Sequence, residues 1–102
     1  MLYKVQLIEE AREDFKKLDY SQKMQVSKQL KSLEINPYKG KRLGHKYGIN
    51  LSGYFKLYAV TKQVRIVYTI KEKEILVEVI SIGMREDFTV YKEAFRRIRK
   101  PV

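Results

Sequence analysis

Hydrophobic positions change their spacing along the chain, and each change marks a new element. Residues 3–8 alternate apolar and other side chains, which is typical of a strand with one buried face. Residues 9–18 then take up helical spacing. Their apolar positions are Ala11, Phe15 and Leu18, with charged residues between them. This pattern predicts an amphipathic helix directly after the first strand.

A second helix is predicted to follow after a short joint. Asp19 or Ser21 is suited to cap its first turn. The helix should end at Asn36, because the following Pro37 disfavours the helical conformation at the residue before it. Its apolar stripe consists of Val26, Leu30 and Leu33. Two adjacent helices with a short joint predict a helical hairpin.

The second half of the chain is predicted to be mainly strand. Residues 38–53 have little periodicity and several glycines, so we expect mainly loop there. Three segments rich in Val, Ile and Tyr follow, joined by short polar turns, which predicts an antiparallel meander. Their bounds are about 54–60, 64–70 and 75–82. Residues 87–99 return to helical spacing, with Asp87 as a candidate cap.

This order of elements indicates an α+β protein, in the order β-α-α-β-β-β-α. We expect a small antiparallel sheet with an N-terminal helical hairpin and a C-terminal helix. A chain of 102 residues, 44% of them hydrophobic, can build one compact core, so we expect a single domain over residues 1–102. The longest apolar stretch is short and contains Glu78, which favours a soluble, cytoplasmic protein without a membrane segment.

The register of the central hairpin decides which side chains share a face of the sheet. Pairing Val60 with Val64 mixes charged and core side chains on both faces. Pairing Thr61 with Val64 separates them, and so does a four-residue loop of the same parity. One face then holds Phe55, Leu57, Ala59, Ile66, Tyr68 and Ile70, and the other holds Tyr54, Lys56, Tyr58, Arg65, Val67 and Thr69. Burial favours this separation, which gathers a lysine, an arginine and two phenols on the solvent side.

Charge and composition limit which partners, metals and cofactors we expect. The 22 Lys and Arg against 12 Asp and Glu give a net charge of +10, which favours nucleic acid as a partner, although exposed Lys and Arg are also ordinary on a solvated sheet face. The chain has no cysteine and a single histidine, so we expect no disulfide, no metal and no cofactor. His45 falls in the glycine-containing loop and is interpreted as a surface residue.

Several ordered segments resemble the RelE toxin family. They are residues 53–57, 64–68, 79–86, 90–94 and 97–98, and residues 11–18 and 36–37 resemble the helical hairpin of that family. The resemblance covers nearly the full length and depends on the order and spacing of the whole set. It implies a toxin of a type II toxin-antitoxin system, in the RelE/ParE superfamily. It further implies a ribosome-dependent mRNA endoribonuclease that inhibits translation.

The resemblance also implies which residues act. It places active groups at Arg65, Arg85 and Tyr91, with Lys56 at a fourth, basic position. The chain departs from the family at Tyr58, where RelE has a second lysine that is important for catalysis. This departure puts the general base in doubt, and we assign the proton transfer to Tyr91, with Lys56 or Tyr58 assisting. Tyrosine and lysine have ordinary pKa values of about 10, so either needs a cationic neighbourhood that lowers its pKa.

Two basic groups are candidates for contacts with RNA phosphates or with an acidic antitoxin. They are Lys39, Lys41, Arg42 and Lys46 in the loop, and Arg96, Arg97, Arg99 and Lys100 at the C-terminal end. The implied partners are mRNA in the ribosomal A site, the ribosome and a cognate acidic antitoxin. Two alternatives stay open. One is a ParE-type toxin that poisons DNA gyrase by protein contact. The other is a degenerate toxin or non-catalytic nucleic-acid-binding module, which the departure at Tyr58 favours.

Overall fold

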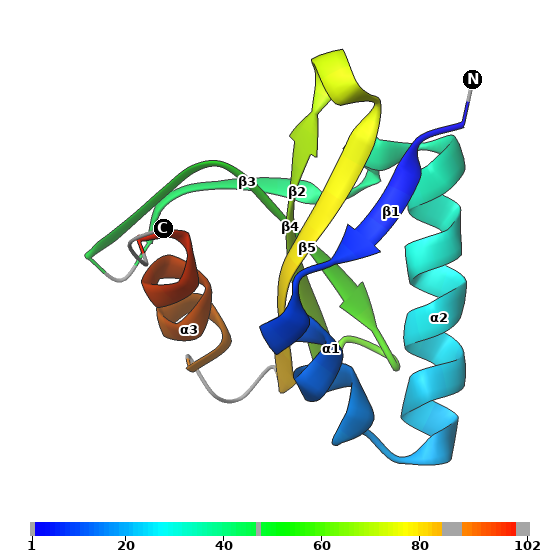
Figure 1. The fold of residues 1–102 in the computed structure, drawn as a ribbon. Coiled ribbons are helices and arrows are strands. Elements are labelled where there is room, and N and C mark those ends of the chain that lie inside the picture. The colour runs from blue at the N-terminus through cyan, green and yellow to red at the C-terminus, as the bar shows by residue number, and fades with distance from the viewer. Residues whose placement is uncertain (1, 47, 85–88, 100–102) are drawn as a thin grey trace.

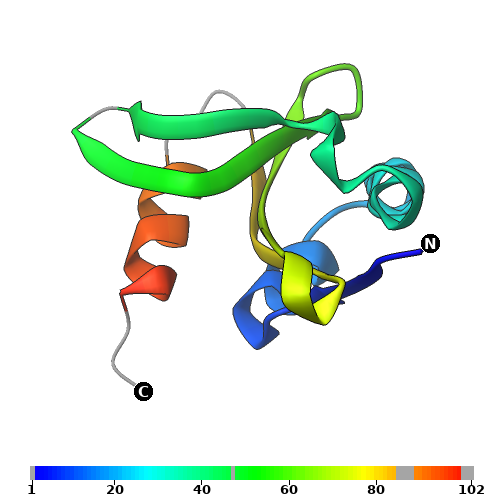
Figure 2. The ribbon, with the colours of Figure 1, turned by 90° about the horizontal axis from the view of Figure 1, so that it is seen from above.

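The protein is a mixed five-stranded sheet with helices on both faces (Figures 1 and 2). The structure is a computed structural model that describes residues 2–46, 48–84 and 89–99, except for the side chains of Lys46 and Thr89. The strands are β1 (Lys4–Leu7), β2 (Lys41–Lys46), β3 (Ile49–Ala59), β4 (Val64–Lys71) and β5 (Leu76–Met84). The helices are α1 (Glu9–Lys16), α2 (Tyr20–Ile35) and α3 (Thr89–Ile98), with short 3-10 turns η1 (Pro37–Lys39) and η2 (Glu72–Glu74).

The strands lie in the order β1-β5-β4-β3-β2. β1 runs parallel to β5, and the other neighbouring pairs are antiparallel. The expected α+β class, helical hairpin and C-terminal helix are confirmed. The sheet differs from the expectation in two respects. It has an additional strand, β2, and its first strand pairs in parallel, because α1 and α2 return the chain to the far edge of the sheet before the other strands begin.

The helical hairpin forms where the spacing predicts it. α2 begins at Asp19, which accepts a hydrogen bond from the Gln22 backbone, while the Gln22 side chain accepts one from the Asp19 backbone. This reciprocal pair is a capping box, and it identifies Asp19, not Ser21, as the cap. The helix ends at Ile35, directly before Asn36 and Pro37, as expected.

The prediction of a loop over residues 38–53 was wrong. This segment contains β2 and the first part of β3, which form an antiparallel pair with a register shift between Arg42 and Gly44. Gly44 has a positive φ, which suits an irregularity in the pairing. Glycines and lysines interrupt the apolar alternation, and Leu43 is the one side chain of β2 buried in the described part, so the sequence shows little strand pattern.

The predicted parity of the central hairpin is confirmed. Ala59 pairs with Val64 across a four-residue loop, which is the longer of the two variants considered. The loop closes with a hydrogen bond from the Gln63 amide to the Val60 carbonyl (2.9 Å), and the two-residue turn is not formed. Phe55, Leu57, Ala59, Ile66 and Tyr68 accordingly lie in the core on one face.

Each face of the sheet has its own hydrophobic core. On the face that the helical hairpin covers, which we call the hairpin face, α1 and α2 pack on the side chains just named. On the α3 face, the apolar stripe of α3 packs on the sheet with Leu43, Leu51, Val67 and Ile80. The outer part of the β2–β3 hairpin bends toward α3 (Figure 2). In the described ranges, no helix combines the length and the apolar character needed to cross a membrane.

Candidate functional site

Four of the predicted site residues come together on the α3 face. Lys56 and Tyr58 lie on β3, Arg65 lies opposite Tyr58 on β4, and Tyr91 lies on α3. We call these four residues the Arg65 cluster. The Arg65 guanidinium carbon lies 5.5 Å from the ring centre of Tyr58 and 5.0 Å from that of Tyr91. The cation therefore contacts two phenol rings, an arrangement that stabilises it electrostatically.

The face that carries this cluster is less open than expected. Arg65 is 8% exposed, so the prediction of a solvent-facing position was wrong for this residue, and Tyr91 is 1% exposed. The reason is α3, which packs against this face of the sheet. Lys56 and Tyr58 are partly exposed. Arg65 is therefore a buried cation beside the partly exposed Tyr58.

Arg65 has unused hydrogen-bonding capacity. Its Nε and Nη1 atoms are buried and have no hydrogen-bond partner within the described part of the chain. Burial of a cation with two donor atoms left without hydrogen bonds is costly, and the two ring contacts offset only part of that cost. Guanidinium presents its N–H groups as a planar fork that matches two oxygens of a phosphate. The two donor atoms without a partner therefore suit an anionic ligand.

The pKa of the Tyr58 phenol is lowered within the cluster. Lys56 donates a hydrogen bond from Nζ to the Tyr58 hydroxyl (3.2 Å). That bond, together with the charges of Lys56 and Arg65, lowers the pKa of Tyr58 from its ordinary value, against an opposing effect of burial. Tyr54, on the same strand, shows the contrast, because burial raises its pKa. The cationic neighbourhood that a phenol base requires is thus present around Tyr58.

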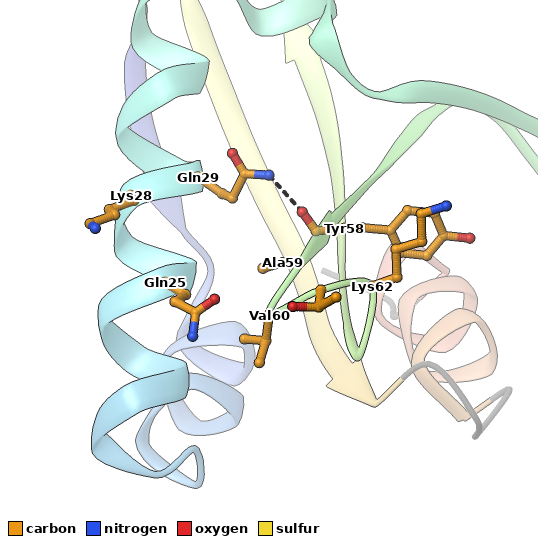
Figure 3. Close-up of a pocket in the computed structure, with 8 residues that line it drawn as sticks. Gln25, Lys28, Gln29, Tyr58, Ala59, Val60 and Lys62 are labelled. Carbon is orange, nitrogen blue, oxygen red and sulfur yellow. Dashed lines mark hydrogen bonds between the residues drawn. The ribbon is translucent and has the colours of Figure 1, made fainter.

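A groove adjoins Tyr58 on its backbone side. It has a volume of about 530 Å³ and lies between α2 and the loop that joins β3 to β4 (Figure 3). The Gln29 side chain donates a hydrogen bond to the Tyr58 carbonyl (2.6 Å), so α2 holds the end of β3 in place. Gln29 was not among the sequence candidates, because a glutamine on a helix carries no pattern that marks this contact.

The loop group of basic residues divides between the two faces of the sheet. Lys41 is exposed and lies opposite Lys56 in the β2–β3 pair, so it extends the Arg65 cluster. Arg42 lies opposite Phe55 and stacks on that ring from the hairpin face (5.1 Å). Lys39 donates hydrogen bonds to Gln29 and Ser32 of α2 (both 2.9 Å), and the Lys46 side chain lies outside the described residues.

One prediction about the basic group at the C-terminal end was wrong. Arg97 is not a surface residue: its side chain is 7% exposed and forms an ion pair with Asp14 (2.7 Å). A guanidinium held in this way is not free to contact RNA. Arg96 is exposed and pairs with Glu93 (2.7 Å), and Arg99 lies over the Phe95 ring. Lys100 falls outside the described residues.

Two further residues considered in the sequence analysis are Arg85 and His45. Arg85, predicted as an active group, lies outside the described residues. His45 is exposed, as expected, but it belongs to β2 and not to a loop. Over the described ranges, no three His, Asp or Glu side chains gather in a group that could hold a metal ion.

Comparison with known proteins assigns the fold to a family. The family model of the ParE-like toxin of type II bacterial toxin-antitoxin systems matches residues 5–94. The mRNA interferase toxin RelE of Escherichia coli is 31% identical over 104 residues, which cover 96% of this chain and 99% of the relative.

Solved structures agree with this assignment. A double arginine-to-alanine mutant of E. coli toxin RelE in the free state has a TM-score of 0.77 and 28% identity, and it covers 96% of this chain and 99% of its own. The toxin in a RelBE toxin-antitoxin complex from Mycobacterium tuberculosis has a TM-score of 0.71 and 26% identity, over 85% of this chain and 95% of its own. The chain belongs to the ParE-like toxins of type II toxin-antitoxin systems, and within the RelE/ParE superfamily its relatives are RelE-like.

Proposed function

We propose that this toxin is a ribosome-dependent mRNA endoribonuclease and that the Arg65 cluster is its active site. The observation that carries the proposal is Arg65 itself, a buried cation with two unpartnered N–H-bearing nitrogens among the described residues. A buried charge of this kind is suited to an anionic ligand. The phosphodiester of RNA is the anion that the relatives named mRNA interferases lead us to expect.

The proposed reaction uses the RNA's own 2′-hydroxyl. Its oxygen forms a bond to the adjacent phosphorus, the bond from phosphorus to the 5′ oxygen breaks, and the products carry a 2′,3′-cyclic phosphate and a 5′-hydroxyl. A base takes the 2′ proton, and an acid returns a proton to the departing 5′ oxygen. The chemistry requires no redox partner and no water until the cyclic product is opened.

The cluster offers a group for each role. Arg65 is suited to the equatorial phosphate oxygens, where negative charge increases as the fifth bond forms. Tyr58 is suited to accept the 2′ proton, because Lys56 and Arg65 lower its pKa. Tyr91, to which the sequence alone led us to assign the proton transfer, contacts Arg65 from α3 and is the other candidate. Arg85, for which the resemblance implies a place in the site, completes the proposal as a second phosphate ligand.

The surrounding basic residues are proposed to hold the RNA or the ribosome. Lys41 is the best placed, because it lies opposite Lys56 and is exposed. Arg42, Lys39, Arg96 and Arg99 are exposed enough to contact phosphates elsewhere on the surface, and Lys46 and Lys100 stay in the proposal from the sequence alone. Phosphate contacts of this kind position a nucleic acid without selecting its sequence.

We also propose a cognate acidic antitoxin as the partner that silences the toxin. The M. tuberculosis relative is known as a toxin-antitoxin complex, and the charge of +10 suits an acidic chain. Binding should weaken as salt rises, because attraction between exposed charges is screened. Equal affinity at low and high ionic strength would show that apolar burial dominates instead.

Primer extension on a translated message tests the proposed function. The purified chain should produce discrete cuts within the reading frame when ribosomes are present and none when they are omitted. A ParE-type gyrase poison, the alternative that the family description keeps in view, would leave the message intact and trap gyrase on cleaved DNA. A degenerate toxin would do neither, so an uncut message refutes the nuclease.

A further inference from the structure

One edge of β5 loses its strand neighbour halfway along. β1 pairs with β5 only as far as Leu7 and Val79, and the chain then turns into α1. Past that point, no other described strand lies beside β5 on this side. The backbone groups of Ile80 and Ile82 on this edge need other partners, because unpaired buried backbone groups are costly.

Two charged side chains supply those partners. The Asp14 carboxylate accepts a hydrogen bond from the Ile82 amide (3.0 Å), and the Arg97 guanidinium donates one to the Ile80 carbonyl (2.8 Å). Asp14 and Arg97 also bind each other through two contacts, of 2.7 and 3.2 Å. Their side chains are 14% and 7% exposed. We call this pair the clasp.

The clasp connects the two faces of the sheet around its edge. Asp14 belongs to α1 on the hairpin face, and Arg97 belongs to the last turn of α3 on the other face. The remaining contacts of α3 with the sheet are mainly apolar, and apolar contacts have little directionality. A paired guanidinium and carboxylate have strict geometry, so a small shift of α3 breaks them. The clasp therefore selects one position of α3.

A second anchor lies at the other end of the helix. Val90 packs directly on the backbone of Gly83, where an added Cβ would lie only 2.9 Å from the Val90 Cβ. Tyr91 is the next residue, and its ring lies 5.0 Å from the Arg65 guanidinium carbon. A helix of ten residues is stiff, so fixing both of its ends also fixes the depth of Tyr91.

We propose that Asp14 and Arg97 are positioning residues for the reaction proposed above, because the clasp holds Tyr91 against Arg65. The catalytic half of this inference rests on the proposed function. The structural half, that the clasp sets the position of α3 over Arg65, stands on the contacts alone. The experiment below measures the two halves separately.

The kinetic arm uses Asp14→Asn and Arg97→Lys, which keep the size of each side chain and weaken the paired contacts. Each should lower kcat for message cleavage by about 10- to 100-fold, as expected for a displacement of about 1 Å, with KM changed by less than about threefold. In a Tyr91→Phe background the same changes should cost much less, because residues that act through one another are not additive. Glu13→Gln and Arg12→Lys are matched controls on α1 that should leave kcat unchanged.

The second arm needs no cleavage. The Arg65 Nε–H signal in a proton-nitrogen NMR spectrum senses the Tyr58 and Tyr91 rings, so it should move in Asp14→Asn and Arg97→Lys and stay in place in both controls. If it moves while the parent chain cuts no message, the proposed function fails and the structural half stands. An Arg65 signal unchanged in both clasp variants overturns the inference. So does an equal loss of kcat with and without the Tyr91 hydroxyl.

Discussion

The two faces of the sheet use the same strands for different purposes. On the hairpin face, Phe55 and Tyr68 stack on each other in an apolar core, with ring centres 5.3 Å apart. On the α3 face, neighbouring positions carry Lys56, Tyr58 and Arg65. Each face has a buried tyrosine and an arginine stacked on an aromatic ring. The two arginines differ: Arg42 is exposed, whereas Arg65 is buried and its Nε and Nη1 atoms have no hydrogen-bond partner within the described residues.

The two buried tyrosines contact different groups. Tyr68 donates a hydrogen bond to the Pro37 carbonyl (2.8 Å) and accepts one from the Gly40 amide (3.0 Å), so its hydroxyl fastens the segment after α2 to the core. Tyr91 is equally buried but packs on a cation. We infer that the hairpin face maintains the fold and that the α3 face holds a site.

Substitution of the arginines on the two faces should give the largest difference in cleavage rate. Arg65→Gln should lower the rate of message cleavage by about 10²- to 10³-fold, the usual cost of removing one donor to a developing oxyanion. Its stability should stay equal or rise, because a buried, partly unsatisfied cation is removed. Arg42→Gln, which removes the stacked cation of the other face, should change the rate no more than a few-fold, about the effect of one lost phosphate contact. Equal rate losses in the two variants would show that the two faces do not differ in their contribution to cleavage.

The two buried tyrosines provide the next effect. Tyr91→Phe should slow cleavage by about 10²-fold if its hydroxyl moves a proton. Tyr68→Phe should do the reverse: it leaves the Pro37 carbonyl and the Gly40 amide without their partner and lowers the free energy of unfolding by about 1–3 kcal/mol, with the cleavage rate of the folded protein intact. Parent-rate cleavage by Tyr91→Phe would make Tyr91 a core aromatic and assign proton transfer to Tyr58.

The smallest effect concerns the pKa of Tyr58. A phenol acts as a base only when deprotonated, so the rate should rise with pH through the Tyr58 pKa, which Lys56 and Arg65 lower. Lys56→Gln removes the ammonium that stabilises the phenolate, which raises that pKa. The rising limb of the pH-rate profile should then move to more alkaline pH, with about a tenfold loss of rate at neutral pH. An unmoved limb would show that Tyr58 is not the base.

Local patterns predicted the parts of the fold that depend on neighbours in sequence. Asp19 was one of two candidate caps of α2, the end of α2 before Pro37 follows from the proline, and the hairpin parity follows from burial alone. β2 was missed because an irregular edge strand buries little and shows no alternation.

The site was predictable only in part, for a related reason. The parity argument brought Lys56, Tyr58 and Arg65 together, but it could not show that α3 covers them, since helix docking depends on contacts distant in sequence. The partnership of Asp14 with Arg97 spans 83 residues and leaves no local signal, so Arg97 was taken for a surface residue.

The chemistry of the cut ends tests the central claim most directly. That claim is that Arg65 stabilises the phosphate while the 2′-hydroxyl of the message attacks it. Products from a translated message should carry a 2′,3′-cyclic phosphate and a 5′-hydroxyl, a single 2′-deoxy nucleotide at the cut site should abolish the cut, and Arg65→Gln should form these ends at least about 10²-fold more slowly. Products with a 5′-phosphate, a cut at the 2′-deoxy position or an undiminished rate with Arg65→Gln would contradict the account.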